Sequence, residues 1–293
     1  MRIVNFGSLN IDHVYHVDRL ASPGETLSSR AYRRHAGGKG LNQSIALARA
    51  GADVSMVGRI GEGGKWLLDF LNEEGVNTDQ VETIDGANGH AIIQVTPDGE
   101  NAIITVGGAN HRFSPAAADR ALSGFEAGDY LLVQNEISSV AEIIRLGSGK
   151  GLKVVFNPAP VMSETADYPL ELVDWIVMNE TEGAGLTGKS DPNAMLASIV
   201  KEFPNASVVL TQGAQGAILA NRAEKFSIPA IAVNAVDSTA AGDTFIGYFL
   251  SELMQGTEAK AALHTACEAG ALCVTRHGAA DSIPLRSELE RGE

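Results

Sequence analysis

The stretch Val236-Asp-Ser-Thr-Ala-Ala-Gly-Asp-Thr-Phe245 contains the most informative pattern in this chain of 293 residues. From Phe245 to Met254 the apolar residues recur at helical spacing, so residues 240–243 are predicted to form the first turn of a helix. A first turn presents unpaired backbone N–H groups at the positive end of the helix dipole. Because Ala240, Ala241 and Gly242 have small side chains, an anion can approach these groups closely, and the pattern predicts an anion hole.

A single carboxylate, Asp243, lies beside this predicted anion hole. A carboxylate in that place can accept a proton from a hydroxyl group that attacks a bound phosphoryl group. The alternative interpretation is that Asp243 is only the capping residue of an ordinary helix. The local chemistry leaves both interpretations open.

Two separate segments resemble the signatures of the PfkB family of carbohydrate kinases. The segment Asp237-Ser-Thr-Ala-Ala-Gly-Asp-Thr-Phe245 is similar to the second signature, D-T-x-G-A-G-D, and Gly37-Gly-Lys-Gly-Leu-Asn-Gln43 is similar to the other hallmark of the family. The two segments occur in the family's order, about two hundred residues apart, so the pair is far more specific than either alone. The resemblance extends from Gly7 to Pro284.

The resemblance implies a ribokinase-like three-layer α/β/α sandwich with a mostly parallel central sheet and a small β-sheet lid. It also implies a kinase that uses ATP and Mg²⁺ and transfers the γ-phosphoryl group to the primary hydroxyl of a sugar. The motifs are most similar to those of ribokinases, so the expected acceptor is D-ribose and the expected product D-ribose 5-phosphate. Asp243 would then be the catalytic base, and the amides of residues 240–243 would hold the migrating charge.

Composition narrows the classes of partner. The chain has 22 basic and 36 acidic residues, a formal net charge of −14, which disfavours binding to nucleic acid or to an anionic membrane surface. With 44% apolar residues it can bury a large core, and no run approaches the 18 apolar residues of a membrane helix. The segment 1–7 is predicted to be a buried strand and not a signal peptide.

The two cysteines, Cys267 and Cys273, lie six residues apart in one helical pattern, and therefore on different faces of that helix. A disulfide between them is not expected, and buried thiols in a reducing cytoplasm are the simplest account.

Short apolar strands alternate with helical patterns along most of the chain. This alternation predicts a parallel sheet covered by helices on both faces. Because no linker or repeat interrupts it, residues 1–293 are expected to form one domain. The predicted strands are 2–7, 54–57, 130–134, 154–156, 175–178, 208–211 and 217–220, and the predicted helices are 40–50, 66–71, 140–146, 195–203 and 258–275.

Two regions, about 13–36 and 88–106, lack helical periodicity and contain the turn signals Pro23-Gly-Glu-Thr26 and Pro97-Asp-Gly-Glu100. Four strands without crossover helices are expected to form a small sheet apart from the main one. The resemblance implies that this sheet is a lid over the sugar and the interface of a homodimer. The alternative is a pair of surface hairpins.

Asn10 and Asp12 follow the first predicted strand, where open α/β sheets bind ligands. An amide and a carboxylate together suit a polyhydroxy compound, although an Asx turn is an alternative. Glu136 follows the strand 130–134 in the same way, with a solvated loop as the alternative. The resemblance assigns the sugar to Asn10, Asp12, Gly38, Lys39, Asn42, Glu136 and Asp243.

The nucleotide is expected at two other strand ends. Asn179 and Glu182 are three residues apart at a helix start and could hold Mg²⁺ through its waters; they also fit a capping box, and both can be true. The strand 208–211 ends at Thr211, and Gly213 and Gly216 follow, where a nucleotide can approach the backbone. A plain β-turn is the alternative here, but the resemblance assigns Thr211 and Gly213 to the nucleotide.

The resemblance also implies a monovalent cation site, for which carbonyl-rich surroundings favour K⁺. In the alternative, Asp237 only caps its turn. Near the adenine, where related proteins have Asn or His, this chain has Cys267. The residues that match the cation site are Asp237, Ser282 and, through their backbone carbonyls, Thr239, Cys273, Arg276 and Gly278.

Some features leave the substrate open. The loop 58–64 is shorter than is usual in the family and lacks its Asp. A sugar-phosphate kinase would need a cationic clamp, for which Arg33 and Arg34 are candidates. Other sugars such as fructose or deoxyribose, and nucleosides, are alternative acceptors. A sugar-binding regulator without catalysis is disfavoured by the presence of Asp243 and Gly242.

Overall fold

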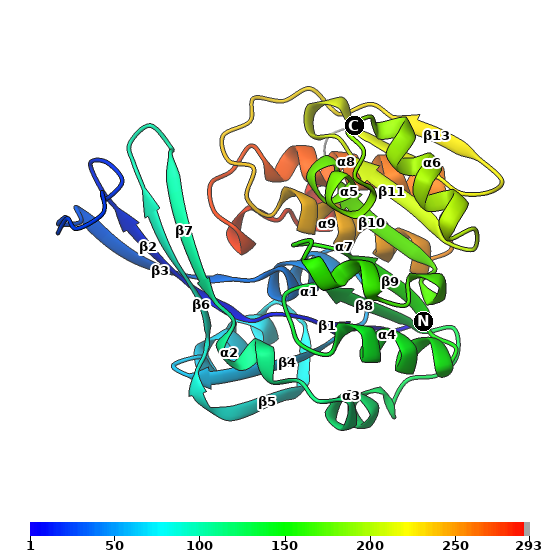
Figure 1. The fold of residues 1–293 in the computed structure, drawn as a ribbon, viewed down its shortest axis with the longest axis horizontal. Helices are drawn as coiled ribbons and strands as arrows, with labels where there is room; N and C mark the ends of the chain where they lie inside the picture. Colours follow the sequence, from blue (N-terminus) through cyan, green and yellow to red (C-terminus); the bar gives the residue numbers. More distant parts are fainter. Residues whose placement is uncertain (290–293) are drawn as a thin grey trace.

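The computed structural model describes residues 1–289. Its main element is a nine-stranded sheet in the order β13-β12-β11-β10-β9-β8-β1-β4-β5 (Figure 1). Neighbouring strands from β5 to β11 pair in parallel, and the last two pair antiparallel. The strands are β1 (Ile3–Phe6), β4 (Val54–Glu62), β5 (Asn77–Ala87), β8 (Tyr130–Gln134), β9 (Lys153–Asn157), β10 (Trp175–Asn179), β11 (Ser207–Thr211), β12 (Ala217–Ala220) and β13 (Lys225–Ile228).

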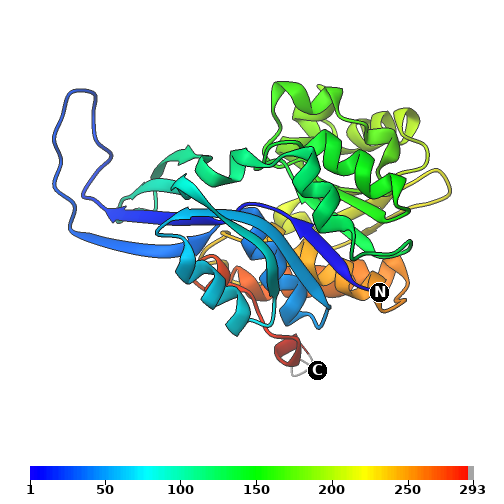
Figure 2. The same cartoon turned by 90° about the horizontal axis from the view of Figure 1, so that it is seen from below.

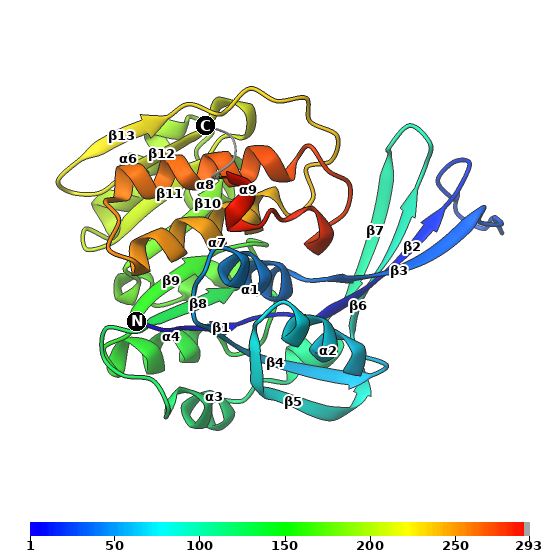
Figure 3. The same ribbon diagram turned by 180° about the vertical axis from the view of Figure 1, so that it is seen from behind.

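Helices cover both faces of this sheet, because its central strands are apolar on both sides. Successive residues of a strand point to opposite faces. Leu132 of β8 accordingly packs in one buried cluster with α1, α2, α7 and α8, and its neighbours Leu131 and Val133 pack in another with α3, α4 and α6 (Figures 1 and 3). The helices are α1 (Lys39–Arg49), α2 (Lys65–Glu73), α3 (Pro115–Leu122), α4 (Val140–Gly149), α5 (Glu180–Thr187), α6 (Pro192–Glu202), α7 (Ala241–Met254), α8 (Ala259–Cys273) and α9 (Arg286–Leu289).

The predicted small sheet is present and projects from the body of the protein (Figure 2). Its strands are β2 (Asn10–His16), β3 (Ala31–Gly37), β6 (Gly89–Val95) and β7 (Asn101–Val106), in the order β3-β2-β6-β7. The first of them begins earlier than predicted, so Asn10 and Asp12 lie on a strand of this lid sheet and not in a loop after β1. The sugar-binding candidates are thereby held by a hydrogen-bonded ladder.

The predicted three-layer arrangement with a mostly parallel sheet is confirmed, but some elements were missed. The edge strand β5 contains many polar residues and is largely exposed, so it lacks the continuous apolar run by which the central strands were found. The interpretation of residues 58–64 as a loop was wrong for Gly58 to Glu62, which extend β4 and pair with β5 across irregular register steps. The last four residues of the predicted domain lie outside the described part of the chain.

Two further expectations concern helices and thiols. Within residues 1–289, no helix is long and apolar enough to cross a membrane. Cys267 and Cys273 both lie on α8, are buried and form no disulfide, as expected from their spacing.

Candidate active site

The start of helix α7 has the conformation that an anion hole needs. Ala240 is its N-cap, with φ 61°, and Ala241 is its first residue, so the helix begins one residue later than predicted. A positive φ is costly for a residue with a Cβ, and the family signature has glycine at this position. The N–H of Ala241 already donates to the carbonyl of Ser238 at 3.3 Å. Gly242 and Asp243, in the first turn, have no acceptor within the helix and leave their N–H groups for an anion.

The two signature segments meet at the carboxylate of Asp243, whose side chain is 7% exposed. The amide of Asn42 donates to Oδ2 of Asp243 at 3.0 Å, and the amide of Gln43 donates to Oδ1 at 2.9 Å. Helix α1 therefore holds the candidate base of helix α7 through two neighbouring residues. The carbonyl oxygen Oδ1 of Asn42 is buried without a protein partner, so it remains available to a hydroxyl group of a ligand.

A cavity of about 190 Å³, called here the polar cavity, opens beside Asp243. Lys39 lines it, and its ammonium group carries charge: burial alone would lower the pKa of Lys39, but the carboxylates of Asp243, Glu136 and Glu182 raise it above its usual value. A cation thus faces the place where the anion hole and the candidate base converge. The residues that line the polar cavity are Lys39, Asn157, Val177, Met178, Asn179, Glu182, Thr211, Ser238, Ala240, Gly242, Asp243 and Ile246.

Among the predicted sugar-binding residues, Asp12 has a carboxyl group whose surroundings disfavour its charged form. Burial, and secondarily the charge of Glu136, raise its pKa from 3.8 to about 6. The glycine pair before α1 makes room for this group: a Cβ on Gly37 would lie 2.1 Å from Oδ2 of Asp12. Gly38 has φ 95°, a conformation that favours glycine.

Glu136 is not the solvated loop residue of the alternative interpretation. Its Oε2 accepts hydrogen bonds from Oγ of Ser8 and, at 3.0 Å, from the backbone N–H of Lys39. Glu136 therefore holds the turn that carries Lys39, besides any contact with a sugar.

Sequence reasoning missed the residue that orients Asn10. Asn110, in the short 3₁₀ helix Gly108–Arg112, is buried; it donates to Oδ1 of Asn10 at 2.7 Å and accepts from the N–H of Leu9 at 3.0 Å. This contact fixes which end of the Asn10 amide faces Asn110, so the amide nitrogen of Asn10 points away from Asn110. A lone Asn one hundred residues away has no local signal that could have revealed this role.

Asn179 and Glu182 form the predicted capping box at the start of α5. Oδ1 of Asn179 accepts from the N–H of Glu182, and Oε2 of Glu182 accepts from the N–H of Asn179, both at 2.9 Å. Burial raises the pKa of Glu182 against the opposing effects of the Asn179 N–H and of Lys39. Both residues also line the polar cavity, so the cap presents an amide and a carboxylate to it.

A second cavity, of about 540 Å³ and called here the apolar cavity, adjoins the first. Thr211, Ser238 and Gly242 line both. Cys267 is in its wall, and burial, with a smaller effect of Glu268, raises the pKa of this thiol to about 11, so it stays protonated at neutral pH. The other lining residues are Gly213, Ala214, Gly216, Ala230, Ile231, Ala232, Val233, Ala235, Ala241, Phe245, Gly270, Ala271 and Val274.

Most residues of the predicted cation site come together where the segment that precedes α7 meets the segment that follows α8. Oδ1 of Asp237 accepts from the N–H and Oγ1 of Thr239 at 2.9 and 2.6 Å, and Oδ2 accepts from the N–H of Gly278 at 3.0 Å. Burial would raise the pKa of Asp237, but these hydrogen bonds lower it, so the group is ionised. Sγ of Cys273 lies 3.1 Å from Oγ of Ser282.

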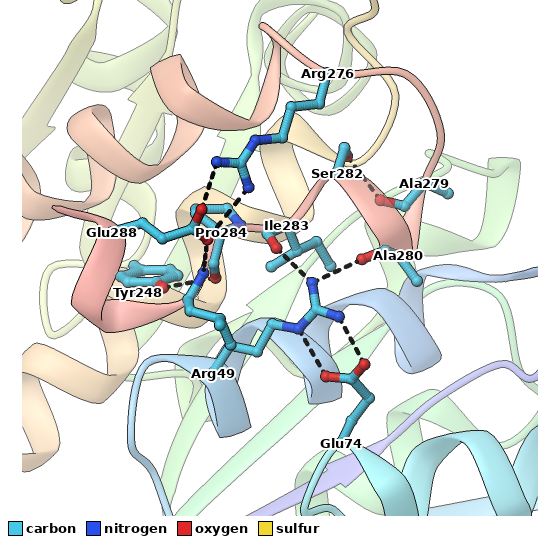
Figure 4. A network of polar contacts seen from close by, with 11 residues as sticks. Arg49, Glu74, Tyr248, Arg276, Ala279, Ala280, Ser282, Ile283, Pro284 and Glu288 are labelled. Atoms are coloured by element: carbon cyan, nitrogen blue, oxygen red, sulfur yellow. Dashed lines mark hydrogen bonds and ion pairs between the residues drawn. The ribbon is translucent and has the colours of Figure 1, made fainter.

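The side chain of Arg276 points away from that group and pairs with Glu288 at 2.7 Å (Figure 4). Arg49, at the end of α1, donates to the carbonyls of Ala280 and Ile283 while it pairs with Glu74. The C-terminal segment is thus tied to α1. Within residues 1–289 no cluster of three or more His, Cys, Asp or Glu side chains could hold a metal ion.

The arrangement combines a carboxylate, an ammonium group and free helix N-terminal amides at the carboxyl ends of parallel strands. The carboxyl edge of a parallel sheet is the place where open α/β proteins bind their ligands, so the fold and this arrangement define the protein as one of that class. Residues 1–286 match the pfkB family carbohydrate kinase. The chain belongs to this family of carbohydrate kinases, as its two signature segments predicted.

Individual relatives agree with this assignment. The chain is 36% identical over 291 residues to a ribokinase of Haemophilus influenzae, covering 96% of this chain and 95% of the relative. It is 35% identical to a ribokinase of Staphylococcus aureus over 308 residues, with 99% of both covered, and 32% identical to a deoxyribokinase of Salmonella typhimurium over 294 residues, with 97% and 96% covered.

Solved structures are similar over nearly the whole chain. A ribokinase of Cryptococcus neoformans in complex with ADP has a TM-score of 0.87 at 32% identity, covering 99% of both chains. An Arabidopsis thaliana ribokinase complexed with ribose and ATP has a TM-score of 0.86 at 30% identity, covering 99% of this chain and 97% of that one.

Proposed function

We propose that this kinase transfers the γ-phosphoryl group of ATP to the primary hydroxyl of D-ribose and produces D-ribose 5-phosphate. The observation that carries the proposal is the carboxylate of Asp243, which Asn42 and Gln43 hold in the first turn of helix α7, beside the free N–H groups of that turn. The ribokinase relatives support ribose as the acceptor, and the similar structure with ribose and ATP supports the pair of substrates.

In the proposed reaction Asp243 takes the proton of the sugar hydroxyl as its oxygen bonds to the γ-phosphorus. The bond from the γ-phosphorus to the bridging oxygen breaks, and ADP leaves with the electron pair. The free amides of Gly242 and Asp243 and the ammonium group of Lys39 stabilise the charge on the transferred group. Asn10 and Asp12 bind sugar hydroxyls and hold the attacking oxygen in line.

The nucleotide is proposed to span the two cavities. Its base and ribose fit the apolar cavity, beside Gly213 and Gly216, and its phosphates pass Thr211 into the polar cavity. Mg²⁺, which neutralises phosphate charge when bound, would be held through its waters by Asn179 and Glu182. Both residues line the polar cavity, and a carboxylate and an amide supply the oxygen atoms that Mg²⁺ and its waters prefer.

We further propose a K⁺ site among Asp237, Thr239, Gly278 and Ser282. The ionised carboxylate of Asp237 already accepts three hydrogen bonds and so serves as a counter-charge, while backbone carbonyls of the loop would coordinate the ion. An ion there would not contact the sugar. It would hold the loop that leads into helix α7.

A homodimer formed through the lid sheet is proposed from its exposed apolar side chains. Tyr32 of β3 is 50% exposed, and Ile103 and Ile104 of β7 are 53% and 63% exposed. Both strands belong to the lid sheet, which projects from the body of the protein (Figure 2). Free buried thiols and the use of ATP are consistent with a cytoplasmic enzyme, which is the location we propose.

A sugar phosphate is a weaker candidate substrate. The guanidinium group of Arg34 lies 4.8 Å from the centre of the Trp66 ring, on the face of the lid opposite to Asp12, so it is not placed to clamp a phosphate beside that carboxylate. Arg33 is exposed and lies on the same face as Asp12, so of the two arginines it is the candidate clamp that the register leaves for such a substrate. Deoxyribose is the second candidate, because a deoxyribokinase is among the relatives.

The test is a panel of acceptors with Mg-ATP, with ADP release and the phosphorylated product both measured. We expect ribose to give the largest kcat/KM, ahead of 2-deoxyribose, fructose, fructose 6-phosphate and adenosine. A larger kcat/KM for another acceptor would replace the proposed substrate and leave the kinase family intact. Sugar binding without ADP release for every acceptor would support the non-catalytic alternative.

A further inference from the structure

Gln43 belongs to the first signature segment, yet neither the sugar nor the nucleotide accounts for it. Its side chain lies on α1 next to Asn42 and is completely buried. Its amide nitrogen donates to Oδ1 of Asp243 at 2.9 Å and to Oδ1 of Asn157 at 3.1 Å. Its carbonyl oxygen accepts from Nε2 of Gln134 at 2.8 Å. Both amide protons are therefore used within the protein.

This full occupation separates Gln43 from its neighbour. Asn42 also donates to Asp243, but its Oδ1 is free to accept from a ligand. Gln43 has no proton left to donate to a substrate, so any effect on the reaction passes through its partners, of which Asp243 is the candidate base and Asn157 lines the polar cavity.

The contacts extend from Gln43 across the sheet as an amide chain, defined here as Asn5, Gln134 and Gln43. Nε2 of Gln134 donates to Oδ1 of Asn5 at 2.8 Å as well as to Gln43. Nδ2 of Asn5 donates in turn to the carbonyl of Gly40 and to Oγ of Ser44, both at 2.9 Å. Asn5 and Gln134 are completely buried on the neighbouring strands β1 and β8.

The donors and acceptors of the amide chain have one consistent direction. An ionised carboxylate only accepts hydrogen bonds, so the nitrogen of Gln43 must face Asp243 and its oxygen must face Gln134. In that orientation Nε2 of Gln134 donates to the carbonyl oxygen of Gln43, and it also donates to Oδ1 of Asn5. The amide chain and Asn42 therefore present only donors to the two oxygens of Asp243.

We propose that Gln43 is the positioning residue of the catalytic base. Together with Asn42 it fixes the plane of the Asp243 carboxylate, and Gln134 and Asn5, the other members of the amide chain, fix the side chain of Gln43. The inference rests on the proposed role of Asp243. Two donors, one on each carboxylate oxygen, prevent the group from rotating about its Cβ–Cγ bond. A base displaced by about 1 Å can lose on the order of 10²-fold in rate while the substrates still bind.

The experiment compares wild type with Gln43→Met, which keeps the length of the side chain and removes its hydrogen bonds. We expect kcat to fall about 30-fold, within the range that misplacement produces, with KM for ribose and for ATP within about threefold of wild type. A kcat within threefold of wild type, or a loss that appears only in KM, would overturn the proposal.

A matched control separates positioning from general stability. Ser251→Ala removes a buried hydrogen bond between the same two helices, from Oγ of Ser251 on α7 to the carbonyl of Ala50 just after α1, far from the base. It should lower the midpoint of thermal unfolding and leave kcat unchanged. An equal loss of kcat in both variants would mean that helix packing, and not Gln43, controls the rate.

Gln134→Met and the double variant give a second readout, which also serves if Gln43→Met does not fold. If Gln134 acts only through Gln43, Gln134→Met alone should lower kcat about fivefold. Adding it to Gln43→Met should then cause no further loss, whereas the losses from two independent effects would multiply. An unchanged kcat in Gln134→Met removes the amide chain from the proposal.

Asp243→Asn is measured in parallel. If this variant stays active, Asp243 is not the base, and the proposed role of Gln43 fails with it. If Asp243→Asn is inactive and Gln43→Met has normal activity, only the role of Gln43 is excluded.

Discussion

The polar and apolar cavities share three lining residues but are built in opposite ways. The polar cavity, of about 190 Å³, contains Lys39, Glu182 and Asp243, and two donors from α1 fix its central carboxylate. The apolar cavity has almost three times the volume, about 540 Å³, and among the described residues of its wall only Thr211, Ser238 and Cys267 have polar side-chain atoms. In the proposed mechanism, the reaction therefore takes place in the polar cavity, whose groups are held in fixed orientations, while the apolar cavity mainly provides apolar surface for the flat ring of the nucleotide base.

The largest expected effect tests whether chemistry is confined to the polar cavity. Asp243→Asn should lower kcat about 10³-fold, because general base catalysis typically contributes 10²–10⁴-fold. Affinity for ribose, measured by calorimetry with an ATP analogue that cannot transfer its phosphoryl group, should stay within about tenfold. If more than about a tenth of the wild-type kcat remains, Asp243 is not the base and the contrast between the two cavities loses its basis.

The next prediction concerns pH and Asp12, the proposed sugar-binding carboxylate on β2, which is not part of the lining of the polar cavity. The pKa of Asp12 is raised to about 6, so the carboxylate that should bind sugar hydroxyls is ionised at pH 7.5 and takes up a proton as pH falls through 6. KM for ribose should therefore rise about tenfold between pH 7.5 and pH 5, where roughly a tenth of the group remains charged. KM for ATP, which does not involve Asp12, serves as the internal reference.

Asp12→Ala is the control for that pH dependence. It should raise KM for ribose about 10²-fold at pH 7.5, since the hydroxyl partners are left unpaired, and the remaining KM should no longer vary with pH below 7. A KM that still rises tenfold on acidification in this variant would assign the titration to a different group.

A smaller effect is expected from monovalent cations, which would act on the loop between the two cavities. At constant ionic strength and saturating Mg²⁺, kcat should be severalfold higher with K⁺ than with Na⁺ or a bulky organic cation, with little change in KM, because the ion orders amides that act in the transition state. Asp237→Ala should remove this difference. Equal rates with all cations would exclude the K⁺ site, and activation that persists in Asp237→Ala would locate the ion elsewhere.

The smallest effect is predicted in the apolar cavity. Cys267 stays a protonated thiol, a weak hydrogen-bonding partner, so Cys267→Ala should change KM for ATP by less than about threefold. For the same reason GTP should replace ATP with a loss of kcat/KM below about tenfold. A strong preference for ATP in both proteins would mean that backbone groups of the loop 230–235 select the base, and the apolar cavity would then be as selective as the polar one.

Some of this site could be predicted because its signals are local. The helix that starts at Ala241, the capping box of Asn179 and Glu182, and the apolar strands β8 to β11 are each specified within about ten residues of sequence. Helical and strand periodicity, together with small or capping residues at the ends, follow from backbone geometry and hold wherever the segment is placed. The two signature segments then identified the family.

Other features were decided only when distant segments came together. Gln43 and Asp243 are 200 residues apart, Asn110 lies 100 residues from Asn10, and Gln134 lies 91 residues from Gln43. The orientation of a buried amide depends on which donor or acceptor faces it, and neither periodicity nor propensity along the chain carries that information. The sequence by itself thus determined the apolar central strands, most of the helices, the family and the candidate base, but not the polar edge strand β5. The packing of α1 against α7 and the sheet determined which buried amides hold that base in place.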